Sequence, residues 1–436
     1  MALGLASACG GDPSVVEPPI ATAPACPPGP IAEAFAPGAD AALERGAAFG
    51  LDTPGPILAD DARLSAHRAK VSALHGGGGD PWRAAVSSDA ALADARRRLA
   101  SFEAELRRGE IVEQDRGAIA AAIEIVARAG AVDHARLVVT ETQLFCAPAD
   151  GGFLRLPERD ASFDRNACTS LHPGELLRVL ARGDGGRWWL VDAGHTQGWV
   201  RPDGLGDRLA EDDRIAWRGA PKIWSIADDV RTVAGVPMRL GVGWPLVSRT
   251  PEAITVRVAT ANGVVDDALP GDAAVTVGFA PLRRADVLRA AFAQIGAPYG
   301  WGGRGGARDC SQFLRDTFLP FGVELPRHSS VQAQAGFTTI DVAGWSAADK
   351  LAAIDRASAD GLVLEYMPGH IMLDVGAAQG CRWSISAIAE FLVPCPDGGE
   401  TVHRLDRVAL TDLELGRGSS RGAFIDRITT LAVFGP

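Results

Sequence analysis

The periodicity of the apolar residues changes near Asp133, and this change limits the possible folds of the chain more than any other feature. Between residues 39 and 133 apolar side chains recur at helical spacing, and a Ser-Ser-Asp start at 87–89 precedes the clearest stripe. That stripe consists of Leu92, Ala95, Leu99, Phe102 and Leu106. After Asp133 the chain breaks into short strand-like runs separated by Gly, Asp and Pro. The sequence therefore predicts a helical region followed by β-rich units.

A chain of 436 residues is too long for one hydrophobic core, so several units of roughly 70–150 residues are expected. Between residues 135 and 205 the strand-like runs follow one another closely, which is typical of a small barrel, and a weaker second set covers 254–282. The last unit opens with a helix predicted over 284–295 and ends with strands predicted at 369–376 and 381–386. The expected fold class is α+β with several domains.

The first 38 residues form a short apolar run that ends in Ala-Ser-Ala-Cys9 and continues as a Pro-rich tract. This pattern resembles a bacterial lipoprotein signal, in which the cysteine becomes the lipidated first residue of the mature protein. The usual basic residues before the apolar run are missing, so either the true translation start lies upstream or the match is due to chance. We expect export to the periplasm or cell envelope, with Cys9 as a candidate lipid anchor and 1–38 as signal remnant and tether.

Charge argues against a nucleic-acid partner. The formal net charge is -11 and the sequence pI is about 5.3, whereas phosphate binding needs clustered Lys and Arg. Arg96-Arg97-Arg98 is the single basic triplet and is expected on a solvated helix face. No run reaches the roughly 18 apolar residues of a membrane span. We expect a soluble monomer that binds no nucleic acid.

The seven cysteines show neither a CxxC pair nor the Cys/His spacing of a zinc site, so neither metal nor cofactor is expected. In an oxidising compartment Cys146 could pair with Cys168, and Cys381 with Cys395, which would leave Cys310 unpaired. The alternative, in which all are buried reduced thiols, has equal weight. His67 is expected at the surface.

The stretch "PYGWGGRGGARDCSQFLRDTF" (298–318) places Cys310 after five glycines and before a short predicted helix. Cys310 could be a nucleophile, half of a disulfide, a metal ligand or a small core residue. A helix N-terminus favours the thiolate and lowers a thiol pKa, and glycines let a substrate approach the backbone. A nucleophile is the interpretation that best fits these features.

A thiol nucleophile needs a base and a group that orients the base. His370 begins the predicted strand "HIMLDVG", and Ser384 and Ser386 share one face of the next strand by their period-two spacing. His328, in "LPRHSSVQAQ", is a rival base in a turn. A core cysteine beside an unrelated His370 remains an alternative at this point.

Four motifs together carry a specific resemblance: "GAPYGWGG", "DCSQFLRDTF", "FGVELPRHSSVQAQ" and "PGHIMLDVG". They resemble the catalytic domain of the NlpC (NlpC/P60) family of papain-like bacterial cell-wall cysteine peptidases. Residues 161–205 resemble the bacterial SH3-like domains found on cell-wall hydrolases, and "MRLGVGWPL" (238–246) is similar to a second such repeat.

The resemblance implies hydrolysis of murein (peptidoglycan) stem peptides or muropeptides, at the bond between γ-D-glutamate and the following diamino acid. Cys310 would be the nucleophile, His370 the general base and then acid, and Tyr299 would stabilise the oxyanion with a backbone N–H of Cys310. Asp309 and Ser311 would hold the free amine of an N-terminal L-Ala. Asp164 and Arg165, in "FDR" on the first barrel, are weaker substrate-binding candidates.

Two departures from the family pattern bear on activity. The third polar residue that usually follows the histidine falls on Ser386, or on Ser384 in a shifted register, and its hydroxyl is expected to accept from the imidazole Nδ1–H. Gln312 replaces the usual glycine after Asp-Cys-Ser and is expected to narrow the cleft.

The resulting prediction is an exported cysteine endopeptidase of murein peptides with a five-part chain. The parts are a tether (1–38), a helical region (39–133), two small SH3-like β-barrels (134–207 and 208–282) and a papain-like α+β peptidase domain (283–436). The alternatives are a catalytically weak or inactive wall-binding or scaffold protein, and an amidase or acyltransferase on the same scaffold. The diamino acid preference is left open.

Overall fold

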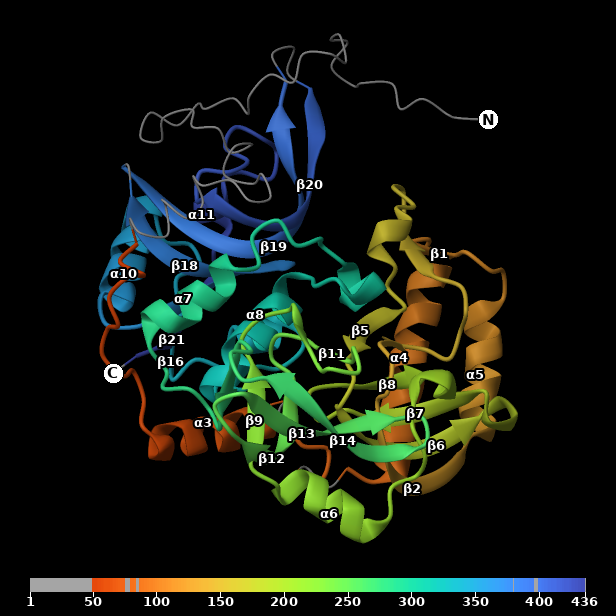
Figure 1. Cartoon of the computed structure of the whole chain (residues 1–436). Helices are drawn as coiled ribbons and strands as arrows, with labels where there is room; N and C mark the ends of the chain where they lie inside the picture. The colour runs from red at the N-terminus through yellow and green to blue at the C-terminus, as the bar shows by residue number, and fades with distance from the viewer. Residues whose placement is uncertain (1–48, 75–78, 84–85, 379, 396–398, 436) are drawn as a thin grey trace.

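The computed structural model describes residues 49–74, 79–83, 86–378, 380–395 and 399–435. The predicted signal remnant and tether, including Cys9, lie outside the described residues. Figure 1 shows a chain in which helices lie at the N-terminal end, antiparallel sheets follow, and a mixed helix and sheet unit forms the C-terminal third. Within the described ranges, no helix has both the length and the apolar character needed to cross a bilayer.

In the described part of the chain, three helices precede the first sheet: α3 (Asp61–Ala73), α4 (Ser88–Arg107) and α5 (Ala118–Arg128). The Ser87 hydroxyl caps α4 by accepting from the Ala90 backbone N–H (3.1 Å), as the Ser-Ser-Asp start predicts. The predicted stripe is buried on α4 at Leu92, Ala95, Leu99 and Phe102. The helical prediction for this stretch is therefore confirmed.

These helices do not share one core. Leu64 and Val71 of α3 pack into the C-terminal core, whereas α4 and α5 pack against Trp188 and Trp199 of the first sheet. Figure 1 shows α3 apart from α4 and α5. The surface prediction for His67 is wrong, because α3 lies on the C-terminal unit and the His67 Nε2 bonds the Glu324 carbonyl at 2.8 Å.

The first sheet has six antiparallel strands in the order β2-β6-β7-β8-β3-β5. Its strands are β2 (Gly130–Leu137), β3 (Thr142–Phe145), β5 (Ala167–Leu171), β6 (Leu176–Gly183), β7 (Trp188–Asp192) and β8 (Gln197–Val200). A small pair, β1 (Ile111–Glu113) with β4 (Phe153–Arg155), lies beside it. Trp188, Trp189 and Trp199 are buried, so the prediction of core aromatics is confirmed. An SH3-like identity for this unit stays a prediction.

The second sheet has five strands in the order β14-β13-β12-β9-β15 and follows the short helix α6 (Glu211–Gly219). Its strands are β9 (Lys222–Ser225), β12 (Gly243–Arg249), β13 (Ala253–Thr260), β14 (Gly263–Pro270) and β15 (Val275–Val277), with a separate pair β10 (Val230–Arg231) and β11 (Pro237–Met238). The buried Trp244 donates its indole N–H to the Pro173 carbonyl (2.9 Å), which joins this unit to the first.

The C-terminal unit contains a six-stranded antiparallel sheet in the order β16-β21-β17-β18-β19-β20. Its strands are β16 (Thr338–Asp341), β17 (Leu362–Met367), β18 (His370–Ala378), β19 (Cys381–Pro394), β20 (Glu400–Asp412) and β21 (Thr430–Phe434), and its helices are α7 (Arg284–Phe292), α8 (Cys310–Phe318), α9 (Ser329–Gln332), α10 (Ala347–Ala359) and α11 (Phe424–Arg427). Helices combined with antiparallel sheets confirm the α+β class, and β19 is longer than the strand predicted at 381–386.

The glycine-rich turn before α8, η4 (Trp301–Gly306), packs directly against β5 of the first sheet. A Cβ on Gly302 would lie 2.2 Å from the Ala167 carbonyl oxygen, and one on Gly303 would lie 2.1 Å from the Ser170 backbone nitrogen. The interpretation that these glycines admit a substrate is therefore wrong for Gly302 and Gly303. They admit a neighbouring strand of the protein itself.

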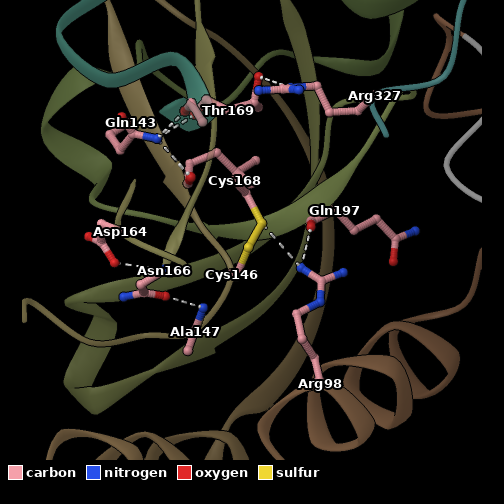
Figure 2. Close-up of a disulfide and its surroundings, with 12 residues drawn as sticks. Arg98, Gln143, Cys146, Ala147, Asp164, Asn166, Cys168, Thr169, Gln197 and Arg327 are labelled. Atoms are coloured by element: carbon pink, nitrogen blue, oxygen red, sulfur yellow. Dashed lines mark hydrogen bonds between the residues drawn. A yellow bond between two sulfur atoms is a disulfide. The ribbon is translucent and has the colours of Figure 1, made fainter. Parts of the chain in front are cut away.

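The predicted disulfide between Cys146 and Cys168 is present, with a Cα–Cα distance of 5.3 Å. Figure 2 shows it joining β5 to the turn after β3, beside Arg98, whose Nη1 donates to the Gln197 carbonyl at 3.1 Å. The Cys168 end of this bond lies one residue before Thr169. The disulfide therefore fixes the strand that η4 packs against.

Cys381 and Cys395 are each disulfide-bonded, but the prediction that they pair with each other is wrong. They stand at opposite ends of the continuous strand β19, so their Cα atoms are tens of ångströms apart at roughly 3.3 Å per residue. A disulfide needs Cα atoms within about 7 Å. Parity and proximity in sequence could not reveal this, because the long strand separates them.

A pair of alanine substitutions tests the packing of η4 on β5. Gly303 and Gly305 both have positive φ (76° and 63°), but a Cβ on Gly305 meets nothing within 4 Å. Gly305→Ala should therefore cost only the left-handed strain of about 1 kcal/mol. Gly303→Ala should cost about 1–3 kcal/mol more because its methyl group overpacks against Ser170. Thermal melting followed by tryptophan fluorescence measures the difference, and equal melting temperatures would contradict the packing.

Candidate active site

Cys310 is the first residue of α8, and its thiol is buried and free of any disulfide. The helix begins there because the Asp309 carboxylate caps it, accepting from the Gln312 backbone N–H at 3.0 Å. The Cys310 sulfur accepts from the backbone N–H of Ile371, the residue next to His370. The local sequence therefore places the thiol at the start of α8 and beside the first residues of strand β18.

Burial, and to a smaller extent the adjacent Asp309 carboxylate, raises the pKa of the Cys310 thiol to about 12. The backbone N–H groups of Ile371 and Ser311 and the Arg327 charge oppose this effect but do not overcome it. The expectation that the helix N-terminus lowers this pKa is therefore wrong for the free protein, because desolvation outweighs the helix. The resting Cys310 side chain is therefore a neutral thiol.

Asp309 is held by a buried arginine. Arg327 binds both carboxylate oxygens, with Nη2 at 2.6 Å from Oδ2 and Nη1 at 3.0 Å from Oδ1. Burial alone would raise the Asp309 pKa, but the Arg327 charge and hydrogen bonds, with the N–H groups of Gln312 and Gly302, lower it overall. Ser311 donates its hydroxyl to Asp309 (3.1 Å) and accepts from Arg327 (2.8 Å).

This closed network changes the interpretation of Asp309 and Ser311. Both were expected to hold a substrate amine, but the carboxylate oxygens of Asp309 already face Arg327, Ser311 and two backbone N–H groups. A substrate ammonium would have to displace a buried guanidinium. In the structure the Asp309 side chain caps the N-terminus of α8, and the Ser311 hydroxyl holds Asp309 and Arg327 in place.

The same arginine reaches the first sheet. Arg327 Nε donates to the Thr169 hydroxyl at 2.8 Å, a residue that Figure 2 shows facing Arg327 beside the disulfide. Gln312 donates to the Ser170 hydroxyl at 2.9 Å and is almost fully buried. The expectation that Gln312 narrows the cleft is therefore wrong. Its amide binds β5 behind the helix.

A second buried arginine precedes the nucleophile. Arg308 donates to Asp316 of α8 (2.7 Å) and to Asp228 of the second unit (2.8 Å). Burial by itself lowers the pKa of Arg308, but the two carboxylates raise it overall. The backbone before Cys310 is thus tied to both β-rich units.

His370 opens β18, and its Nε2 lies 3.1 Å from the Ser386 hydroxyl oxygen on β19. Ser384 instead donates to the buried carboxylate of Glu365. The structure thus brings Ser386, and not Ser384, to the histidine. The expectation of a bond at Nδ1 is wrong, because the Ser386 hydroxyl lies at Nε2 instead.

Burial lowers the pKa of His370 to about 4, and the positive charge of Arg427 adds to the effect. The imidazole is therefore neutral at physiological pH and available as a base. His370 and Cys310 are therefore both neutral at rest.

The chain has two tyrosines, and both lie close enough to Cys310 that its thiolate, when formed, raises their pKa. Burial is the larger cause for each. Tyr299 was predicted as an oxyanion donor and stays protonated here, as a donor must. Tyr366, near the end of β17, was missed because nothing in the sequence distinguishes it from a core residue.

The first unit contributes Phe163 to the site but not the two residues that follow it. The Phe163 ring contacts Tyr299 (6.3 Å between centroids) and Trp301 (5.6 Å). Asp164 accepts from the Phe153 and Asn166 backbone N–H groups, and Arg165 pairs with Glu105 of α4. Their contacts hold the loop in place, so the structure does not bring Asp164 or Arg165 to Cys310.

Other candidates lie away from this centre. His328 is exposed at the start of α9, which favours His370 as the base. A cavity of about 250 Å³ is lined by Lys222, Trp224 and Arg315 among others, but not by Cys310 or His370. Across the described ranges, no group of three His, Cys, Asp or Glu side chains is placed to hold a metal ion.

Comparison with known proteins finds one matching family model and several similar folds. Residues 296–374 match the family model described as "NlpC/P60 family". An NlpC/P60 endopeptidase from Photobacterium damselae subsp. piscicida has a similar fold, with a TM-score of 0.64 and 15% identity over 77% of this chain and 84% of its own. An NlpC/P60 family protein from Bacillus cereus is 14% identical over 69% of this chain and all of its own, with a TM-score of 0.46. No curated protein matches the sequence.

Thiol labelling tests the neutral resting pair. Because burial holds the Cys310 pKa near 12, iodoacetamide should modify it slowly at pH 7, and the rate should still be rising at pH 9. Mass spectrometry of the peptide that contains Cys310 measures the modified fraction. Asp309→Asn removes one cause of the high pKa and should speed the reaction at a given pH. A rate that reaches its plateau below pH 8 would contradict the neutral pair.

Proposed function

We propose, from the match of residues 296–374 to the NlpC/P60 family model, that this protein is a cysteine peptidase of peptidoglycan stem peptides. The single observation that carries the proposal is the placement of Cys310: a free thiol at a helix start that is bonded to the N–H beside His370, whose ring is held by Ser386. This is the arrangement that acyl transfer by a thiol requires: nucleophile, base and orienting group.

In the proposed reaction His370 accepts the Cys310 proton at Nδ1 as the sulfur attacks the peptide carbonyl. The pair passes from neutral to charged during this step, and Ser386 steadies the imidazolium by accepting from Nε2–H. His370 then gives the proton to the leaving amine, which frees the first product and leaves a thioester on Cys310. Water, activated by His370, hydrolyses the thioester and restores the free thiol.

The oxyanion of the tetrahedral intermediate needs donors that are already in place. Tyr299 supplies a phenol that stays protonated, and the raised pKa of this group follows from burial and from the nearby Cys310 and Asp309 charges. Phe163 packs against this tyrosine from the first unit. We propose that Tyr299 and a backbone N–H of Cys310 hold the oxyanion, with Phe163 closing that side of the cleft.

The bond we propose is that between γ-D-glutamate and the following diamino acid. Fragments that carry a free N-terminal L-Ala are the proposed substrates, because the loop that carries Phe163 closes the cleft on the Tyr299 side. An intact wall strand would have to pass this loop. The amine itself needs a partner other than Asp309, whose oxygens are occupied.

Export remains part of the proposal. A disulfide within the first unit, Cys146–Cys168, is typical of proteins that act outside the reducing cytosol. Action in the periplasm or cell envelope fits a peptidoglycan substrate, with Cys9 as the proposed lipid anchor.

A second candidate function has one observation in its favour. The large separation between the pKa of Cys310 (about 12) and that of His370 (about 4) opposes proton transfer in the free protein. A weak or inactive wall-binding protein would share this feature. An amidase or acyltransferase on the same scaffold would differ in product mass.

Incubation with L-Ala-γ-D-Glu-diaminopimelate should release L-Ala-γ-D-Glu, measured by liquid chromatography and mass spectrometry. Cys310→Ala should abolish release. Ser386→Ala should lower kcat by about 10- to 100-fold with little change in KM, because it removes the group that orients the base. No release by the wild type would reject the peptidase proposal, and equal release by Cys310→Ala would reject the nucleophile. Binding of the peptide to an inactive wild type would favour the scaffold function.

The pH dependence follows from the lowered pKa of His370. The imidazole must be neutral to accept the thiol proton, and a pKa of about 4 keeps it neutral at lower pH than an ordinary histidine of 6.5. kcat/KM should therefore lose half of its maximum near pH 4 as pH falls. Steady-state rates in overlapping buffers measure this limb. A midpoint near 6.5 would show that His370 is not held as described.

A further inference from the structure

Arg427 lies beside the base without being part of the chemistry described so far. It ends α11, and its guanidinium carbon is 5.6 Å from the centre of the Phe424 ring. The same ring lies 5.9 Å from the His370 imidazole. Phe424 therefore contacts both the His370 imidazole and the Arg427 guanidinium. Arg427 is close enough to His370 for its positive charge to lower the histidine pKa.

Among the residues that the structure describes, this guanidinium has no counter-ion. In the described part of the chain Arg427 donates to no carboxylate, and the carboxylate of its neighbour Asp426 lies 3.5 Å from Arg417 instead. The other charge felt by Arg427 is positive, from the exposed Arg421. Burial and Arg421 together lower the Arg427 pKa. A half-buried cation in such surroundings would be stabilised by an anion from outside the protein.

The position of Arg427 relative to His370 indicates which part of a substrate it would meet. His370 must protonate the leaving amine, so it faces the nitrogen of the scissile bond. Phe424 and Arg427 lie next to His370, whereas Tyr299 and Phe163 contact each other on the oxyanion side. The residue that follows the scissile bond is therefore the one within reach of Arg427.

We propose that Arg427, with Arg421 nearby, binds a carboxylate on the residue after the scissile bond, and so selects diaminopimelate over lysine at that position. This inference rests on the proposed peptidase function. Diaminopimelate carries a carboxylate at the end of its side chain, where lysine has only an amine. A free C-terminal carboxylate has the same chemistry, so the two sources must be separated by experiment.

Four tripeptides separate them: L-Ala-γ-D-Glu-diaminopimelate, its side-chain carboxamide, its C-terminal carboxamide, and the corresponding lysine peptide. For the wild type, kcat/KM should fall about 10- to 100-fold when the recognised carboxylate is amidated, as expected for a charge-assisted hydrogen bond. A fall with the side-chain amide and with lysine assigns the side-chain carboxylate. A fall with the C-terminal amide alone assigns the chain end and overturns the selection against lysine.

The Arg427→Gln variant should hydrolyse the diaminopimelate peptide and the carboxamide that the wild type disfavours at similar rates. The Arg427→Lys variant should keep part of the wild-type preference for the free carboxylate. Arg249→Gln, an exposed arginine on β12, is the matched loss of charge and should change nothing. Equal rates of wild type on acid and amide, or an unchanged preference in Arg427→Gln, would overturn the inference. If no peptide is hydrolysed, the peptidase proposal fails on its own, and calorimetry of the acid and the amide on Cys310→Ala, with and without Arg427→Gln, still tests the carboxylate site.

Discussion

The arrangement of the site depends on one buried ion pair, that between Arg327 and Asp309. The Asp309 carboxylate fixes the first turn of the helix that carries Cys310, and it can be charged in the interior only because Arg327 binds both of its oxygens. The remaining guanidinium N–H groups reach Thr169, Ser311 and Gln312. Removal of either partner would leave an uncompensated buried charge, at a cost of about 3–5 kcal/mol.

This ion pair connects the nucleophile to the β-rich units that precede it. Thr169 and Ser170 lie on β5, which the disulfide of Cys168 fixes and against which Gly302 and Gly303 pack without side chains. Arg308 makes a comparable link to Asp228 of the second unit. The N-terminal sheets are therefore part of the scaffold of the site and not only a covering for it. The loop that carries Phe163 then extends the first unit to Tyr299.

Much of the fold followed from periodicity and turn residues. The capped helix at Ser88, the strands around the buried tryptophans and the helix at Cys310 all appear where the sequence predicts them, because each depends on local patterns. Strand spacing left Ser384 and Ser386 both open as partners of His370, and the family resemblance favoured Ser386, which the structure places beside the imidazole. What the sequence could not give was long-range pairing. Three features depend on how distant segments pack: the binding of Asp309 by Arg327, the packing of α3 and α4 into different cores, and the separation of Cys381 from Cys395.

The pKa of the Cys310 thiol also could not be predicted from the sequence. A thiol at a helix start suggests a lowered pKa, but the depth of burial decides the outcome, and this can be read only from the folded chain.

The account that results has a neutral thiol which becomes a nucleophile as its proton passes to His370. Its most direct test is to stop the reaction with acid during turnover of L-Ala-γ-D-Glu-diaminopimelate and to analyse the protein by mass spectrometry. The account predicts an adduct of L-Ala-γ-D-Glu, less one water, on the peptide that contains Cys310, whereas hydrolysis with no adduct, or an adduct on another residue, would contradict it.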